Sequence, residues 1–333
     1  MADERNDVNT AWLAVDWGTS NLRVWAMADD GSVLDAMTSD RGMSGLTSDQ
    51  YEDVLVKLAG SHIQSAAAHT PLPVIICGMA GSRSGWSDAG YIDAPVHVGA
   101  LSGSGVSVST KDERIAVRIL PGLRQMDPPD VMRGEETQLA GFAASHPTFR
   151  GQVCLPGTHS KWVRFENGHI SQCQTVMTGE FFALLAEQSI LSHSIASLGD
   201  ISGDLPKGAF LEGVELGYES AGGAFAHLFA LRAGDLVGDD RNGTQRLALL
   251  SGLLVGSEFA AVGPNSAAPI MVIGSQKLGS LYQRAAAHLG FEADFLSGAD
   301  LVLTGLSQAR DKFQPSGSQM PEAMVEVTEG EAS

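Results

Sequence analysis

Two short polar turns in the chain carry the residue types that bind phosphate. In the first, "WLAVDWGTSNLRVWAM", the residues Gly18, Thr19, Ser20 and Asn21 separate two apolar stretches. The glycine lets the backbone approach a ligand closely, and the residues after it offer hydroxyl, amide and main-chain N–H donors to anionic oxygens. We therefore predict a phosphate-binding hairpin, with an ordinary polar hairpin as the alternative for this stretch taken alone.

Asp16 ends the apolar stretch that leads into this turn. A carboxylate beside a bound phosphate is useful only where a cation such as Mg²⁺ lies between the two groups, usually with water among its ligands. Asp16 is therefore a candidate partner for magnesium. The alternative is an aspartate that only caps the hairpin.

The second turn, "LPGTHSKWV", repeats this composition in the other half of the chain. Gly157, Thr158, His159 and Ser160 again combine a flexible backbone with donors, and Lys161 adds a cation. One polar hairpin is common, but a matched pair strengthens the prediction of phosphate binding. His159 alone could ligate zinc, but no Cys, His or carboxylate lies at metal-ligand spacing from it, so a hydrogen-bonded turn histidine is favoured.

A pair of acidic residues marks a predicted helix start in "VMRGEETQLAGFAAS". Glu135 and Glu136 follow Gly134 directly, in the first turn, where the helix dipole favours ionised carboxylates. Phosphoryl transfer to a sugar hydroxyl needs a positioned base, a metal and donors around the phosphate, and an ionised carboxylate is a suitable base. Either glutamate is a candidate for that role. The alternative is simple capping of the helix by acidic residues.

A late glycine turn, "VIGSQKLGSLY", begins at Gly274 and Ser275. Gly274 and Gly279 have the spacing of a P-loop, but Ser280 and Leu281 follow instead of Lys and Ser or Thr, which excludes a Walker motif. We interpret the segment as a strand-to-helix turn against which an adenine or ribose could pack.

Two further signatures are missing from the sequence. No G-x-G-x-x-G motif follows a predicted strand, and "GSRSG" has Arg83 at the position where a G-x-S-x-G hydrolase has its nucleophile. Dinucleotide-binding and hydrolase functions are therefore disfavoured.

Alternating strands and helices must position these turns in the first half of the chain. Residues 12–38 predict an antiparallel meander of three strands, because apolar stretches are separated by short polar turns. A helix is expected over residues 48–68 and a buried apolar strand over residues 73–81. An antiparallel meander and a buried apolar strand, of the kind found in parallel sheets, occur together in this half of the chain. They predict a mixed sheet.

The second half repeats this plan. Residues 151–177 predict another three-stranded meander, and helices are expected over residues 180–196 and 245–262. An apolar strand then breaks at a glycine and enters a helix within residues 269–290. The fold class predicted is therefore α/β, with a duplicated architecture.

A domain boundary is expected near residue 128, where two prolines and a change of pattern occur. This gives an N-terminal domain over residues 10–127 with the first hairpin, and a C-terminal domain over residues 128–312 with the second hairpin and the late glycine turn. Residues 313–333 form an acidic tail without regular apolar spacing, which predicts disorder.

Composition restricts the partners. The net charge of −18 opposes binding to nucleic acid and to anionic membranes, and no apolar run reaches the roughly 18 residues that span a bilayer. The start has no pattern of a secretion signal, and the 3 cysteines form no CxxC pair. We therefore expect a cytoplasmic protein that binds neither nucleic acid nor membrane; a homo-oligomer is compatible with this sequence.

The order of the motifs resembles the sugar kinase, Hsp70 and actin superfamily. More closely, "DWGTSNLRVW", "GMAGSRSGW", "VMRGEETQL", "PGTHSKWV", "TVMTGE" and "LSGLLVGSE" are similar to the 2-dehydro-3-deoxygalactonokinase family, over roughly residues 11 to 310. The resemblance implies an actin-like ATPase fold, in which two ribonuclease H-like domains flank a nucleotide cleft. It also implies ATP and Mg²⁺ as cofactors and phosphorylation of the 6-hydroxyl of 2-dehydro-3-deoxy-D-galactonate in galactonate catabolism.

The resemblance also implies roles for individual residues. Asp16 corresponds to the magnesium partner, residues 18–21 to the β/γ-phosphate turn and residues 157–159 to the second phosphate turn. Glu135 stands where sugar kinases of the superfamily often have an aspartate as base. Glu is one methylene longer than Asp, so neighbouring Glu136 stays an alternative.

A sugar-acid substrate carries a carboxylate, which needs a local cation in so acidic a chain. Arg23, Arg83 and Arg133 lie in or beside the family-like motifs, and a guanidinium can bind a carboxylate through two hydrogen bonds. Each arginine could instead form a salt bridge, and Trp86 could stack on the sugar acid or pack inside the protein. The open alternatives for function are a kinase for another sugar or sugar acid, and a non-catalytic ATP-binding regulatory protein.

Overall fold

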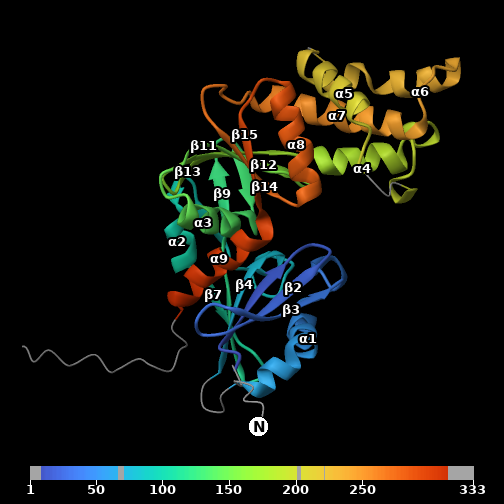
Figure 1. The fold of residues 1–333 in the computed structure, drawn as a ribbon. Coiled ribbons are helices and arrows are strands. Elements are labelled where there is room, and N and C mark those ends of the chain that lie inside the picture. Colours follow the sequence, from blue (N-terminus) through green and yellow to red (C-terminus); the bar gives the residue numbers. More distant parts are fainter. Residues whose placement is uncertain (1–8, 67–70, 201–203, 221, 314–333) are drawn as a thin grey trace, which may run out of the picture.

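The computed structural model describes residues 9–66, 71–200, 204–220 and 222–313. It is a mixed α/β protein with two six-stranded sheets and one three-stranded sheet (Figure 1). Residues 314–333, which include nearly all of the predicted tail, lie outside the described residues.

The first six-stranded sheet begins with the meander predicted over residues 12–38, which is confirmed. Its first three strands pair antiparallel, and the buried fourth strand runs parallel beside the first. The apolar first strand is central in the sheet and almost wholly buried, whereas the third strand, with alternating polar residues, is largely exposed at the edge. In spatial order the strands are β3 (Val33–Ser39), β2 (Leu22–Met27), β1 (Trp12–Trp17), β4 (Leu72–Gly78), β8 (Ile115–Ile119) and β7 (Val106–Val108).

The second six-stranded sheet has the same plan, so the predicted duplication is confirmed. An antiparallel meander is extended on the side of its first strand by two parallel strands, as in the first sheet. A short strand from the first half of the chain adds to the far edge, where Val96 pairs with Ile170. In spatial order the strands are β15 (Ala293–Ser297), β14 (Ile270–Gly274), β11 (Arg150–Leu155), β12 (Ser160–Glu166), β13 (His169–Val176) and β6 (Val96–His97).

The three-stranded sheet and the helices complete the architecture. The small sheet contains β10 (Pro129–Met132), β9 (Gly122–Met126) and β5 (Tyr91–Asp93). The helices are α1 (Tyr51–Ser65), α2 (Val98–Gly103), α3 (Glu135–Ser145), α4 (Thr178–Gln188), α5 (Lys207–Glu219), α6 (Leu228–Val237), α7 (Gly243–Val262), α8 (Gln276–His288) and α9 (Gly298–Asp311). Short 3₁₀ turns occur at Met43–Gly45, Ser48–Gln50, Met79–Gly81, Ile190–His193, Leu198–Asp200 and Gly223–Ala226.

Helix α9 connects the two large sheets and lies between them in Figure 1. On one side it crosses α3 in direct backbone contact, because a Cβ at Gly141 or Gly305 would overlap a carbonyl oxygen of the other helix. On its other side Val302 and Leu306 pack into the core of the first sheet. The start of α3, where the paired glutamates lie, is thus fixed against both halves of the chain.

Helices α4 to α7 form a group beside the second sheet, away from the first sheet (Figure 1). Helix α7 is long and apolar enough by composition to cross a membrane, but 67% of its most apolar 18-residue stretch is buried inside the protein. It packs closely on α5, since a Cβ at Gly213 or Gly252 would overlap a carbonyl oxygen of the facing helix. Its apolar surface therefore belongs to the largest core of the molecule.

Candidate active site

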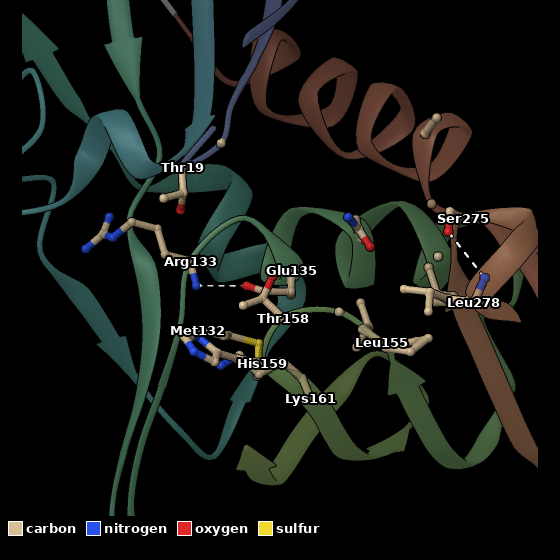
Figure 2. Close-up of a pocket in the computed structure, with 18 of the residues that line it drawn as sticks. Thr19, Met132, Arg133, Glu135, Leu155, Thr158, His159, Lys161, Ser275 and Leu278 are labelled. Atoms are coloured by element: carbon tan, nitrogen blue, oxygen red, sulfur yellow. Dashed lines mark hydrogen bonds between the residues drawn. The ribbon is translucent and has the colours of Figure 1, made fainter. Parts of the chain in front are cut away.

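A cavity of about 820 Å³ receives residues from both large sheets. The segments that reach it include the β1–β2 turn, the start of α3, the β11–β12 turn and the β14–α8 turn. Figure 2 shows Thr19, Glu135, Thr158 and Ser275, which all line this cavity, with Thr19 and Ser275 on opposite sides of the view. The residues predicted from the sequence that line it are Gly18, Thr19, Arg23, Arg133, Glu135, Gly157, Thr158, His159, Gly274 and Ser275.

The β1–β2 turn presents unused main-chain donors. Gly18 N donates to Asn21 O at 2.8 Å, and Met43 N donates to Gly18 O at 3.1 Å. Within the described residues, the main-chain N–H groups of Thr19, Ser20 and Asn21 donate to no protein acceptor. The turn is thus held by its carbonyls and leaves N–H groups for an anion. Ser20 and Asn21 are exposed and do not line the cavity itself.

The β11–β12 turn has the same property. Glu180 N, at the start of α4, donates to Thr158 O at 2.9 Å. In the described part of the chain, the main-chain N–H groups of Gly157, Thr158 and His159 have no protein acceptor. His159 Nε2 lies 2.5 Å from Glu180 Oε2, so α4 holds both the backbone and the imidazole of this turn. Two donor-bearing hairpins therefore open into one cavity.

Glycines bring the start of α3 to this cavity. Gly78 and Gly134 both have positive φ values, +88° and +108°, which disfavour any residue with a side chain. A Cβ at Gly134 would lie 3.5 Å from the Cα of Gly78. This contact joins the end of β4 to the first turn of α3. The paired glutamates are thereby positioned next to the carboxyl end of β1.

The two glutamates have different surroundings. Glu135 lines the cavity, and its Oε2 accepts a hydrogen bond from Arg133 N at 3.0 Å (Figure 2). Glu136 is only 1% exposed, and its Oε2 accepts from Gly134 N at 2.7 Å. The hydroxyl of Thr137 donates to the other carboxylate oxygen at 3.2 Å. Glu136 therefore points into the protein, while Glu135 faces the space where a ligand would bind.

Their protonation also differs. Burial, with the charge of Glu135 as the next cause, raises the pKa of Glu136 from 4.5 to about 8. Burial raises the pKa of Glu135 too, but the ammonium group of Lys161 opposes that rise. At neutral pH Glu136 therefore carries a proton. Of the two, Glu135 has the environment of a proton acceptor.

Asp16 lies at the end of β1 beside this region, although it is not among the residues lining the cavity. Its side chain is 23% exposed, and burial raises its pKa while Arg23 opposes the rise. Arg23 is the cross-strand neighbour of Asp16, and its Nη1 lies 3.8 Å from Asp16 Oδ2. Among the described residues no cluster of three or more His, Cys, Asp and Glu could hold a metal by itself.

Of the three predicted arginines, Arg133 has the most unusual environment. Its guanidinium lies 4.4 Å from the centre of the Tyr91 ring, and Nη2 donates to Gly90 O at 2.9 Å. Its Nε and Nη1 are buried and have no partner in the described chain. Arg83 is exposed and lies outside the cavity lining.

Trp86 also lies outside the cavity lining. Its ring stacks on Tyr51 at 6.1 Å between centroids and meets Trp17 edge-on at 6.3 Å. These contacts belong to the core of the first sheet.

The late glycine turn joins β14 to α8. Ser275 caps the helix, since its hydroxyl oxygen accepts a hydrogen bond from Leu278 N at 3.4 Å (Figure 2). Leu278 and Phe295 add apolar surface to this end of the cavity. Phe295 packs on Gly279, where a Cβ would overlap its ring. Leu278 and Phe295 thus make this end of the cavity apolar.

A family model described as 2-keto-3-deoxy-galactonokinase matches residues 16–309. The chain belongs to this family. Its identification from the sequence is thereby confirmed.

Two curated members of the 2-keto-3-deoxy-galactonokinase family are similar over nearly their whole length. The probable 2-dehydro-3-deoxygalactonokinase DgoK1 of Rhizobium meliloti (strain 1021) is 39% identical over 91% of this chain and 98% of the relative. The 2-dehydro-3-deoxygalactonokinase of Escherichia coli (strain K12) is 31% identical over 89% of this chain and 96% of the relative.

A solved structure supports the same family fold. A crystal structure from Sinorhizobium meliloti, of a protein given the 2-dehydro-3-deoxygalactonokinase name, is similar with a TM-score of 0.79. It is 37% identical to this chain and covers 94% of it, and the match includes 99% of that structure.

One cavity residue of this family member was noted from the sequence only as the cation of the second turn, without a role of its own. Lys161 on β12 lines the cavity and is only 6% exposed. Its Nζ donates to Thr175 Oγ1 at 2.9 Å. The signal for it was a lysine directly after the second hairpin and next to the apolar residues Trp162 and Val163.

Proposed function

We propose that this protein is an ATP-dependent 2-dehydro-3-deoxygalactonokinase. It transfers the γ-phosphoryl group of ATP to the 6-hydroxyl of 2-dehydro-3-deoxy-D-galactonate, in galactonate catabolism. The observation that carries the proposal is that two hairpins with unused N–H groups and the carboxylate of Glu135 open into one cavity. Membership of the family and the names of its curated relatives support this activity.

The nucleotide would lie across the cavity. The unused N–H groups of the two hairpins, those of residues 19–21 in the turn of residues 18–21 and those of residues 157–159, would bind the phosphates. The adenosine would pack at Gly274 and Ser275. In this proposal two ribonuclease H-like domains, residues 10–127 and 128–312, flank the nucleotide. The shared strand order of the two large sheets supports that division.

Glu135 would act as the base. Its carboxylate accepts the proton of the 6-hydroxyl while the hydroxyl oxygen attacks the γ-phosphorus in line with the leaving oxygen of ADP. Glu136 is buried and protonated at neutral pH, so it is less suited to this role. Closure of the two halves over the substrate would exclude water from the reaction.

Magnesium suits the residues present. Mg²⁺ is usually held by one or two carboxylates together with substrate phosphates and water, so the lone carboxylate of Asp16 beside the first hairpin fits an ion bound with the nucleotide. Asp16 forms a salt bridge with Arg23, whose Nη1 lies 3.8 Å from Asp16 Oδ2, a separation longer than a hydrogen bond. Such an ion would neutralise charge on the phosphates during transfer.

The carboxylate of the sugar acid would bind to Arg133. This side chain lines the cavity, and a guanidinium binds a carboxylate through charge-assisted hydrogen bonds. Arg23, also in the cavity lining, is more exposed and lies beside Asp16. Arg83 and Trp86 lie outside that lining, so they are less favoured substrate contacts.

The proposed partners and location of the protein agree with this activity. The proposed partner is a small sugar acid, and the net charge of −18 disfavours nucleic acid and anionic membranes. A cytoplasmic enzyme fits a role in sugar-acid catabolism.

A coupled ADP-release assay tests the proposal. The protein is given MgATP with 2-dehydro-3-deoxy-D-galactonate, its gluconate epimer or glucose. Fast turnover is expected on the first acceptor. Turnover on another acceptor alone would assign a different sugar kinase activity, and ATP binding without any turnover would indicate a regulatory protein.

A further inference from the structure

Lys161 is a buried cation that lines the cavity without an ion pair. Its side chain is 6% exposed, and Thr175 is its one hydrogen-bond partner among the described residues. No described carboxylate forms a salt bridge with it. Burying an unpaired charge is unfavourable, so such a group is retained where a ligand of opposite charge completes its surroundings.

The ammonium group is held in a defined position. Thr175 accepts a hydrogen bond from Lys161 Nζ at 2.9 Å, and its own hydroxyl donates to Asp130 Oδ1 at 2.6 Å. Thr175 N donates to the other Asp130 oxygen at 2.6 Å. Asp130 lies on β10, the strand that leads into Glu135. One N–H of the ammonium is thus used for positioning, and two are left for a ligand.

The other basic side chains of the cavity are held by protein groups or are more exposed. His159 pairs with Glu180, and Arg133 is fixed on Gly90 and Tyr91. Arg23 is 48% exposed and lies beside Asp16. Among the basic side chains that line the cavity in the described part of the chain, Lys161 is therefore the least exposed, and it makes one hydrogen bond to the protein.

We propose that Lys161 is a further catalytic residue, whose ammonium group binds the transferring phosphoryl group next to Glu135. This inference rests on the proposed kinase function. As the bond from the acceptor oxygen to the γ-phosphorus forms, the bond to ADP breaks and its electron pair stays on the ADP oxygen. Glu135 takes the hydroxyl proton, while Lys161 keeps its protons and donates two hydrogen bonds to phosphoryl oxygens.

Lys161 has a second, measurable effect, on Glu135. The charged groups that act on Glu135 are Lys161 on β12, which lowers its pKa, and Asp16 on β1, which raises it. Its helix neighbour Glu136 is protonated at neutral pH. Removing the Lys161 charge must therefore move the acid limb of the pH–rate profile to higher pH.

The test compares Lys161→Met with Lys57→Met, which removes an exposed lysine on α1 outside the cavity lining. We expect Lys161→Met to lower kcat at least about 100-fold, as for loss of other donors to a developing charge, and to move the acid limb upward. Lys57→Met should stay within about twofold of the unmodified protein. A folded Lys161→Met protein with kcat within threefold, or an unmoved acid limb, overturns the proposal.

Two further measurements keep the test decisive. If Lys161→Met does not fold, Thr175→Val keeps the charge but loses its anchor; a kcat lowered about tenfold supports the proposal, and an unchanged kcat overturns it. Failure of the sugar-acid assay on the unmodified protein would reject the proposed substrate alone. Calorimetry then decides on Lys161: Lys161→Met, or Thr175→Val, must weaken binding of a non-hydrolysable ATP analogue more than binding of ADP, and equal weakening overturns the role.

Discussion

Replacing Glu136 by glutamine should stabilise the protein in a pH-dependent way. The pKa of Glu136 is raised from 4.5 to about 8 in the folded state, so ionising it in the fold is unfavourable. Below pH 4.5 Glu136 is protonated in both the folded and the unfolded protein, so the folded state keeps its full stability. As the pH rises from 4.5 through 8, the unfolded state gains stability by ionising this group, and the free energy of unfolding falls. The loss is about 3 kcal/mol at pH 7 and under about 1 kcal/mol at pH 5.

Glutamine matches the protonated side chain in shape and hydrogen bonding. Its amide oxygen can accept from Gly134 N and its amide NH₂ can donate to the hydroxyl oxygen of Thr137, where Glu136 now bonds. Because glutamine does not titrate, the variant avoids the loss. Glu136→Gln should therefore exceed the unmodified protein in stability by an amount that grows from pH 5 to pH 7.

Urea unfolding followed by tryptophan fluorescence at several pH values between 5 and 8 measures this difference. The exposed Glu187 on α4 provides the control, and Glu187→Gln should give a difference that stays near zero. A Glu136→Gln difference independent of pH would refute the reasoning, since Glu136 would then ionise as it does in water. The same variant should keep kcat within about threefold, because Glu135 is the proposed base.

Three further predictions concern the cavity. Glu135→Gln should lower kcat at least about 100-fold while ATP affinity, measured by calorimetry, is preserved; full activity would remove it as the base. Arg133→Met should raise the KM for the sugar acid at least about tenfold with little change in the KM for ATP, and the opposite pattern would assign Arg133 to the nucleotide. Gly279→Ala forces the Phe295 ring to move, so the KM for ATP should rise and stability in thermal unfolding should fall by about 1–3 kcal/mol. An unchanged KM for ATP would show that the nucleotide does not contact this apolar surface.

The fold was predictable from the sequence where the signals are local. Both meanders follow from apolar stretches broken by short polar turns. The helix expected over residues 180–196 ends at Gln188, because Ser189 is extended and its hydroxyl caps a new 3₁₀ turn. The short strands β5, β6, β9 and β10 were not predicted, since their pairing depends on partners far away in the chain, as Val96 with Ile170 shows.

The candidate site was likewise predictable where residue types alone indicate the chemistry. The two hairpins and Glu135 were found from residue types, and they do share one cavity. The contrast between Glu135 and Glu136 was not predictable, because it depends on which side chain the crossing of α3 and α9 buries. Lys161 was passed over as part of a polar turn, since nothing local shows that its strand position is enclosed.

Helix α9 has a consequence for how the chain folds during synthesis. It covers the face of the first sheet formed by apolar residues of β1, β2 and β4, yet the ribosome makes it after every other described strand and helix. The N-terminal sheet therefore cannot finish folding as an independent unit while translation continues. A nascent chain that ends before residue 298 leaves that face in water, where chaperones and proteases act, so a late nonsense or frameshift mutation should remove the whole protein rather than release a working half.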